Sequence, residues 1–561
     1  MSLDLRTLLR SSPKALLARL VRLNVLARTG LHQDLRPLLA TDAPAWQAAL
    51  DAARNGRKVV IATNNGGQFG LSAIDRLLAV ALTLRGASVH TVLCDRALPA
   101  CMMCELNLQP DPARFAASGP SRLLCGYCHG PAAAAQHRLG LAAERLGDFI
   151  TPEDRVEAER IAGALDLDAL RNWTWDGLPL GEHAYAGTLR YFARGTLEDE
   201  PQGLAVARRY LAAAVMTARA YRRLFERLKP EVVVAHHGIY SPQGVVAAVA
   251  RAAGIRVVTW NPAYRRHCFI FSHDDTYHHT LMTESVARWA DTPLTEAQRT
   301  GIIDYLLSRR EGREDWIRFH KDPDYATRAR LAELGLAPDK PLVVAFTNVF
   351  WDAQLHYPTN AFASQIDWLA ATIEVFAGRP DLQLVIRVHP AEVSGSPASR
   401  QRAADEIAKR FPVLPANVAI VPPESPLSSY QLADLANAVL IYATKMGVEL
   451  TAMGIPVVAA GEAWVRNKGI TEDVTSPEHY RAILARLPFD RVDEPARRER
   501  ALRYAHHFFF RRMIPLAFVM PEHGPRRFTV AARTLDQLRP GGDAGLETIC
   551  RGILAGAPFE A

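Results

Sequence analysis

The strongest constraint on the fold is the alternation of short apolar runs with longer helical patterns along most of the 561 residues. Near the start, the β-branched run RKVVIAT is followed by the glycine-rich NNGGQFG, the helical pattern AIDRLLAVALTLRG and the run SVHTVLCD. We expect Ser72 to cap this helix, with Asp75 completing a capping box. The same order returns in LKPEVVVAHHGIYSPQGVVAAVARAAGIRVVTW. Strands that alternate with helices are typical of parallel sheets, so the sequence predicts an α/β fold.

A second series of strand patterns comprises PLVVAFTNV, LQLVIRVHP, VAIVPPE, AVLIYAT and IPVVAAG. Since 561 residues are too many for one hydrophobic core, the two series predict two Rossmann-like, doubly wound domains. We place the first at 51–295 and the second at 341–490, with a linker at 296–340. A helical segment at 1–50 precedes them, and helices at 491–561 are expected to pack back on the first domain. Ligands of such sheets bind beyond the carboxyl ends of the strands, which predicts a central cleft.

Charge and hydropathy restrict the location and the partners of the chain. The net charge of +7 suits an anionic substrate, and no basic motif studded with aromatics predicts nucleic-acid binding. No apolar stretch is long enough to cross a bilayer, and arginines interrupt the first thirty residues, unlike a signal peptide. We therefore expect a cytoplasmic protein. The amphipathic, basic start indicates either a helix packed on the protein or peripheral contact with the inner face of the membrane.

An anion-binding site is predicted in the stretch AVLIYATKMGVELTAMG. A buried strand ends before Thr444, which is placed to cap the next helix, so free backbone N–H groups face the cleft. Lys445 adds a positive charge, and Gly447 allows a ligand to approach the backbone. Glu449, in the first helical turn, would accept hydrogen bonds from sugar hydroxyls, or it only complements the helix dipole.

The strand LVIRVHPAE adds two further donors to the same edge. Arg387 and His389 alternate with apolar residues at the end of a buried strand, where solvated positions are not expected. Both are therefore predicted to point at the crevice that holds Lys445. The alternative for His389 is a structural histidine at a strand end.

The segments FTNVFWDAQLHY, IRVHPAE and YATKMGVELTAMGIPVVAAGEAWVRNKG resemble the capsule polysaccharide biosynthesis glycosyltransferases. This family has the GT-B fold and includes the bacterial β-Kdo transferases, with CDP-glycerol glycerophosphotransferases more distant. The resemblance covers about residues 340 to 475 and implies that the second domain binds a nucleotide sugar while the first holds the acceptor. Its implied phosphate and sugar contacts are Arg387, His389, Thr444, Lys445, Gly447 and Glu449.

Two further groups of polar residues follow strands of the second domain. Asp352, in TNVFWDAQ, would bind a sugar hydroxyl or act as a base, and the alternative is a helix cap. Glu462 and Lys468, in GEAWVRNKG, are assigned to donor binding, with a solvated loop as the alternative. Trp464 beside these charges suits stacking on a sugar.

The first domain supplies the predicted acceptor site and base. Asn65, Gly66 and Gly67 form a glycine-rich turn that allows close approach of a sugar, although the spacing is not G-x-G-x-x-G. His236 and His237 end a buried strand, and one of them is the predicted general base. Because neighbouring strand residues point to opposite faces, at most one is expected to reach the substrate.

Four cysteines form a separate pattern, C-x2-C, twenty residues, then C-x2-C, within an insertion at 94–130. In a cytoplasmic chain this spacing indicates a structural zinc site rather than disulfides, with an iron–sulfur cluster as the alternative. The four predicted ligands are Cys101, Cys104, Cys125 and Cys128.

These features together predict a GT-B glycosyltransferase that transfers a sugar, from a donor resembling CMP-Kdo, to a surface polysaccharide or its lipid acceptor. No catalytic metal is predicted, because no DxD-type motif occurs in the cleft strands. Two alternatives stay open. One is a CDP-polyol phosphotransferase on the same scaffold, and the other is a non-catalytic glycan-binding component of a capsule assembly complex.

Overall fold

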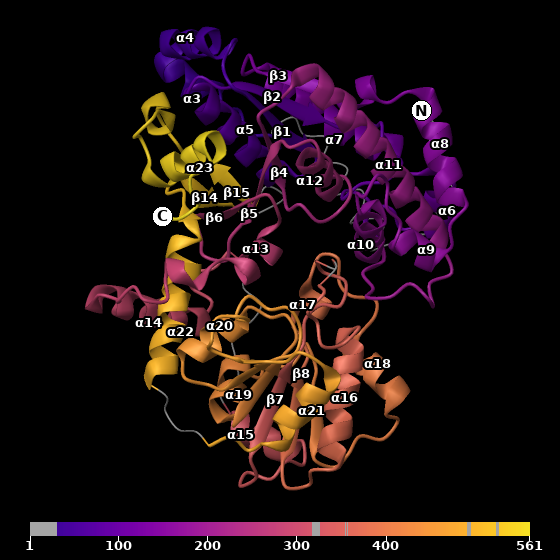
Figure 1. The fold of residues 1–561 in the computed structure, drawn as a ribbon, viewed down its shortest axis with the longest axis vertical. Coiled ribbons are helices and arrows are strands. Elements are labelled where there is room, and N and C mark those ends of the chain that lie inside the picture. The colour runs from indigo at the N-terminus through magenta and orange to yellow at the C-terminus, as the bar shows by residue number, and fades with distance from the viewer. Residues whose placement is uncertain (1–30, 317–325, 354, 356, 491–494, 523–526) are drawn as a thin grey trace.

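The fold consists of two α/β units, each built on its own sheet, and was analysed as a computed structural model (Figure 1). The structure describes residues 31–316, 326–353, 355, 357–490, 495–522 and 527–561. The predicted α/β class with two Rossmann-like sheets is confirmed. The predicted amphipathic start, residues 1–30, lies outside the described residues.

The first sheet has the strand order β13-β6-β5-β4-β1-β2-β3. Strands β1 to β5 run parallel, while β6 pairs antiparallel with both β5 and β13. The central strands are almost entirely buried, as expected for parallel strands covered by helices on both faces. The strands are β1 (Lys58–Asn64), β2 (Ser88–Leu93), β3 (Ala142–Arg145), β4 (Val232–His236), β5 (Arg256–Pro262), β6 (Cys268–His273) and β13 (Ile514–Pro515).

Helices cover both faces of this sheet. Helix α5 is apolar all round and almost wholly buried, because it lies between the sheet and the C-terminal elements. Residues 94–130, predicted as an insertion, belong to the crossover that links β2 to β3. The helices are α3 (Arg36–Leu39), η1 (Ala40–Asp42), α4 (Ala43–Ala53), α5 (Phe69–Thr83), α6 (Pro112–Ser118), α7 (Arg122–His137), η2 (Leu146–Phe149), α8 (Pro152–Gly163), α9 (Leu167–Arg171), α10 (Leu180–Phe192), α11 (Gly203–Leu228), α12 (Gln243–Ala252), α13 (Tyr277–Thr283) and η3 (Val286–Arg288).

The start of α5 differs from the prediction. The helix begins at Phe69, so Ser72 lies inside it and its hydroxyl bonds to the carbonyl of Gly66. Asp75 is buried, and it accepts hydrogen bonds from Thr63 and Trp260. The expected capping box is wrong because these buried partners take the Asp75 carboxylate into the core.

The second sheet has the order β12-β11-β10-β7-β8-β9, and all its strands are parallel. Its strands are β7 (Leu342–Phe346), β8 (Gln383–Arg387), β9 (Val418–Val421), β10 (Ala438–Ile441), β11 (Val457–Ala459) and β12 (Glu472–Asp473). Its helices are α14 (Glu296–Arg310), α15 (Thr327–Glu333), α16 (Gln365–Ala377), α17 (Ala391–Ser394), α18 (Ala403–Arg410), α19 (Ser429–Leu435), α20 (Met446–Ala452) and α21 (Pro477–Ala485).

The C-terminal segment runs from the second unit back to the first, along one side of the molecule (Figure 1). It contains strands as well as the expected helices, and β13 extends the first sheet by pairing with β6. Its elements after α21 are α22 (Pro495–His506), η4 (His507–Arg511), β13, β14 (Val519–Pro521), β15 (Phe528–Val530), η5 (Leu535–Leu538) and α23 (Ala544–Ala555).

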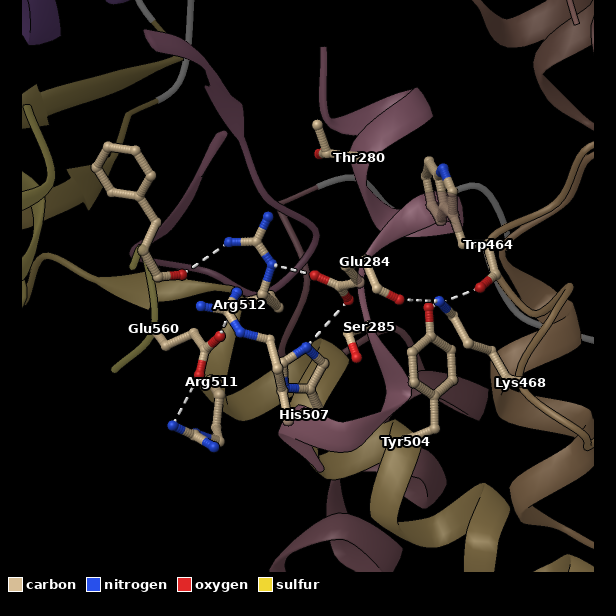
Figure 2. Close-up of polar contacts among 12 residues, drawn as sticks. Thr280, Glu284, Ser285, Trp464, Lys468, Tyr504, His507, Arg511, Arg512 and Glu560 are labelled. Atoms are coloured by element: carbon tan, nitrogen blue, oxygen red, sulfur yellow. Dashed lines mark hydrogen bonds and ion pairs between the residues drawn. The ribbon is translucent and has the colours of Figure 1, made fainter. Parts of the chain in front are cut away.

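A buried group of charges, here called the joint, ties the C-terminal segment to both units (Figure 2). Glu284, which follows α13, binds His507 at 3.0 Å and Arg512 at 3.1 Å. From the second unit, Lys468 donates to the carbonyls of Met282 and Glu284, each at 3.3 Å. The joint thereby fixes the loop after β11 against the first unit. Across the described chain, the search for a helix with the length and apolarity to traverse a bilayer found no candidate.

Candidate functional site

A cleft of about 2090 Å³ lies between the carboxyl ends of the two sheets. Both units contribute side chains to its wall, as the sequence predicts for a pair of doubly wound sheets. The polar side chains that matter for chemistry are His236, His237, Tyr240, His278, Asp352, His389, Thr444, Lys445 and Glu462.

His389 is held at the cleft in one tautomer. Its backbone N–H donates to the Thr347 hydroxyl at 3.0 Å, and its Nδ1 accepts the backbone N–H of Ala391 at 3.0 Å. Because Nδ1 is an acceptor, the proton of the neutral ring sits on Nε2. The half-buried ring can therefore present an N–H donor to an anionic ligand.

Thr444 and Lys445 line the cleft as predicted, but the lysine has a carboxylate partner. Its ammonium lies 3.2 Å from Glu449 and 4.5 Å from the centre of the Tyr264 ring. Glu449 also pairs with Arg309 of α14 at 2.9 Å and accepts the Tyr430 hydroxyl at 2.6 Å. The two positive charges therefore share one carboxylate beneath the cleft wall.

Glu449 and Gly447 differ from their predicted donor contacts. Glu449 is 0% exposed, so its oxygens serve the buried pair with Arg309 rather than a sugar hydroxyl. A Cβ on Gly447 would lie 2.8 Å from Ile441 and 3.0 Å from Val465. The small residue at this position is required by packing inside the unit.

Arg387 and Lys468 also have protein partners. The Arg387 guanidinium reaches the cleft wall but donates to the carbonyls of Pro422, Ser425 and Leu427. Lys468, 1% exposed, lies in the joint. Assigning the Lys468 ammonium to the donor is wrong, because backbone carbonyls bind it outside the cleft.

Asp352 and Glu462 stand at the rim of the second unit. The Asp352 carboxylate accepts the Tyr240 hydroxyl of the first unit at 2.9 Å, so the two units meet across the cleft here. Glu462 accepts hydrogen bonds at 2.6 Å from both the backbone N–H and the hydroxyl of Thr359. Trp464 packs against Tyr277, 5.5 Å between ring centres. Asp352 is exposed, and Glu462 is half-buried.

His236 and His237 both line the cleft, against the expectation that only one would. His236 ends β4, whereas His237 has a φ of +67°, which turns the chain out of the strand alternation. His236 Nε2 lies 2.8 Å from the carbonyl oxygen of Asn261, so Nε2 carries the proton. Burial lowers the pKa of His236 to about 4, and burial followed by His236 lowers that of His237 well below its usual value.

His278 is a cleft residue that the sequence reasoning missed. Its ring stacks on His237 with 5.7 Å between centres and also contacts Trp464. The signal was present in HDDTYHH, directly after a strand, but the stretch reads as an ordinary polar loop. Burial, followed by the neighbouring His279, lowers the pKa of His278 to about 3.

The predicted acceptor turn is used partly for packing. Asn65 and Gly66 are buried, and a Cβ on Gly66 would lie 2.3 Å from Ala132 and 2.4 Å from the carbonyl oxygen of Cys128. Gly66 therefore lets α7 approach the turn, and this close contact leaves no room there for an acceptor. Gly67 does reach the cleft wall, while its N–H donates to the Cys128 sulfur at 3.1 Å.

The four predicted metal ligands belong to one buried group of thiols. Cys125 interacts electrostatically with Cys101 and Cys128, and the thiols of Cys101 and Cys104 hydrogen-bond to each other. Within the part of the chain that the structure describes, no three side chains of the metal-binding types are arranged to hold an ion.

Residues 321–494 match the profile of a family described as capsule polysaccharide biosynthesis protein. This match confirms the resemblance that the sequence motifs of the second unit indicate. No curated protein matches the chain.

Among solved structures, similarities include two KpsC domains of Thermosulfurimonas dismutans. The β-Kdo 2,4 transferase is 12% identical, with 49% of this chain and 79% of that chain covered and a TM-score of 0.33. The β-Kdo 2,7 transferase is 14% identical, with 57% and 88% covered and a TM-score of 0.30. UDP-GlcNAc 2-epimerase from Neisseria meningitidis, bound to UDP-GlcNAc, is 11% identical, with 80% and 94% covered and a TM-score of 0.26. The fold assignment given above comes from the two parallel sheets themselves.

Proposed function

We propose that this chain, whose second unit matches the capsule polysaccharide biosynthesis family, is a glycosyltransferase that uses a nucleotide-activated sugar. In this proposal the donor lies against the second sheet, and a polysaccharide or glycolipid acceptor lies against the first. The observation that supports it best is the cleft between the sheets, which gathers a histidine donor, a lysine and two further histidines. The reaction would take place in the cytoplasm, with peripheral contact to the inner membrane where the acceptor is a lipid.

The donor phosphate is assigned to His389, Thr444 and Lys445. As the bond from the anomeric carbon to phosphate breaks, negative charge grows on the phosphate oxygens. Donors that are already oriented stabilise that charge without reorganisation. His389 offers Nε2–H because Nδ1 is occupied by Ala391, and Lys445 offers an ammonium whose direction is fixed by Glu449.

The base is assigned to His237. His236 donates through Nε2 to Asn261, and its Nδ1 is buried with no partner among the described residues. His237 is half-buried at the cleft and stacked between Tyr240 and His278. Since burial keeps its ring unprotonated at neutral pH, His237 can accept the proton of the acceptor hydroxyl. Asp352, bonded to Tyr240, is the second candidate.

Thermal denaturation in the presence of nucleotides and nucleotide sugars tests donor binding. A ligand that binds only the folded protein stabilises it by about 2.7 kcal/mol at a hundred times its Kd. We expect a cytidine nucleotide sugar to raise the Tm of the full chain, and His389→Ala to abolish most of that rise. His479→Ala is the matched control, because His479 lies on the exposed start of α21, outside the cleft. An unchanged shift in the His389 variant would overturn the donor assignment.

The same experiment separates the alternatives. Protection by CMP and CMP-sugars favours a Kdo-like donor, whereas protection by CDP and CDP-polyols favours a polyol phosphotransferase. Absence of any nucleotide effect favours a non-catalytic glycan-binding protein. A transfer assay with His237→Gln then tests the base, for which we expect a loss of about 10²–10⁴-fold in kcat with little change in KM.

A further inference from the structure

Five cysteine thiols gather at the carboxyl ends of β1 and β2. Cys94 directly follows β2, and Cys101 and Cys104 lie in the next loop. Cys125 and Cys128 stand one helical turn apart on α7. Electrostatic interactions link Cys94, Cys101, Cys125 and Cys128 to one another, and Cys104 is bonded to Cys101. The proposed glycosyl transfer uses none of these groups.

Backbone amides surround the sulfurs in the way that thiolates require. The N–H of Gly67 donates to the Cys128 sulfur at 3.1 Å. The amides of Met103 and Cys104 point at the Cys101 sulfur, and the N–H of Cys104 also closes a turn on the Cys101 carbonyl at 2.8 Å. Such N–H groups stabilise negative charge on a buried acceptor.

We propose that Cys101, Cys104, Cys125 and Cys128 bind one Zn²⁺ through four thiolates. The two C-x2-C pairs come from a loop and from a helix that face each other across the Gly67 turn, which is the pattern of a closed structural site. On binding, each thiol gives up its proton, so four protons are released and the four thiolates with Zn²⁺ carry a net charge of −2.

Two arginines stand where they would offset this charge. Arg190 donates to the carbonyl of Met102 at 3.0 Å, inside the first C-x2-C pair. The Arg96 guanidinium carbon lies 4.0 Å from where a Cβ of Gly126 would stand, inside the second pair.

Binding also requires side-chain rotation. In the structure Cys101 and Cys104 bond to each other, and no three metal-binding side chains among the described residues surround a common point. Rotation about Cα–Cβ brings sulfurs of a C-x2-C pair toward one ion without moving the backbone. The bound ion would then fix α7 and the 101–104 loop against Gly67, Met102 and Met103, which line the cleft.

Metal analysis of the full chain, purified without chelators, tests the site independently of glycosyl transfer. We expect one zinc per chain in the wild type and in the controls Cys94→Ala and Cys268→Ala, and a loss of that zinc in Cys125→Ser/Cys128→Ser. Cys94 belongs to the same thiol group but to neither pair, and Cys268 is a buried thiol of β6. Loss of zinc from Cys94→Ala, with retention in the double variant, would overturn the ligand set.

A second measurement covers a double variant that does not fold. Wild-type protein, freed of zinc with a mercurial and then repurified with reductant, is titrated with Co²⁺. A thiolate-to-cobalt charge-transfer band that saturates at one equivalent supports the site. A brown protein containing iron and sulfide overturns zinc in favour of a cluster. Purified protein with neither metal nor cobalt band, and with its thiols open to alkylation, overturns the proposal.

Discussion

At the scale of single residues, the Glu449 carboxylate decides whether two buried cations are tolerated. Glu449→Gln would leave Arg309 and Lys445 to share an amide, and Arg309 is itself buried. Breaking a buried pair by removing one partner costs about 3–5 kcal/mol, because the other charge stays uncompensated. We expect a loss of that size in the free energy of unfolding, measured by urea denaturation.

The control for Glu449→Gln is Glu333→Gln. Glu333 pairs with Arg330 at 2.9 Å on the surface of α15, where solvent screens both charges. We expect no measurable change in stability for that variant. Equal stability of the two variants would show that Glu449 is not part of a buried ion pair.

His32 gives a residue-scale prediction for the dependence of stability on pH. Burial, followed by the charge of Arg76, lowers the pKa of His32 from 6.5 to about 3. Because the folded pKa is the lower one, the stabilisation is present above pH 6.5 and is lost as the pH falls toward 3. At pH 5 the loss amounts to about 2 kcal/mol for this group. His32→Gln should therefore flatten the fall in unfolding free energy between pH 7 and pH 5, and an unchanged slope would contradict the assignment.

The sequence predicts where polar residues stand along a strand better than what they bind. His389, Thr444 and Lys445 lie at the cleft because the position after a parallel strand necessarily meets the edge of the sheet. Arg387 and Lys468 stand at equally suitable positions, yet backbone carbonyls distant in sequence satisfy them. Those carbonyls belong to loops whose paths no local pattern specifies.

At the scale of elements, the contact between α7 and the glycine turn sets the wall of the cleft. Gly66→Ala would place a methyl group 2.4 Å from the Cys128 carbonyl oxygen, so either the turn or the helix must shift. Overpacking of this kind costs about 1–3 kcal/mol. We expect that loss in urea denaturation of Gly66→Ala, together with weaker binding in the cleft, because Gly67 and Gln68 line it.

Gly130, on the same helix, provides the matched control. A Cβ there would meet nothing within 4 Å, and its φ is not positive. Alanine in a helix interior is more stable than glycine by about 0.5–1 kcal/mol. Gly130→Ala should therefore stabilise the chain while Gly66→Ala destabilises it. A common sign for both would show that helix propensity, and not the contact with the turn, dominates.

Elements with a strong apolar pattern were predictable, and short ones were not. Each of the predicted strand patterns in the second series corresponds to one of β7 to β11, because buried parallel strands are nearly continuous β-branched runs. The two-residue strands β12 and β13 carry no such run, so their pairing depends on tertiary contacts alone. The entry into α5 was misread because Asp75 finds buried partners on β1 and β5.

At the scale of the whole molecule, three separate parts of the chain meet in the joint. Glu284 comes from the first unit, Lys468 from the second, and His507 and Arg512 from the C-terminal segment (Figure 2). Although burial alone would raise it, the pKa of Glu284 is lowered by His507 and Arg512. The carboxylate is therefore ionised in the folded protein and balances the surrounding cations.

Removing that charge should separate the unfolding of the two units. Glu284→Gln leaves Arg512 buried without its carboxylate, at a cost of about 3–5 kcal/mol, and that cost falls on the contact between the units rather than on either sheet. Calorimetry should then show a lower Tm and a calorimetric enthalpy above the van't Hoff value, as two transitions part. Glu311→Gln, whose exposed carboxylate pairs with exposed Arg313, should keep the wild-type profile. A single, sharp transition in Glu284→Gln at the wild-type Tm would mean that the units are coupled through the Tyr240–Asp352 bond and the contacts of Gln401 with Gly195 and Thr196, and not through the joint.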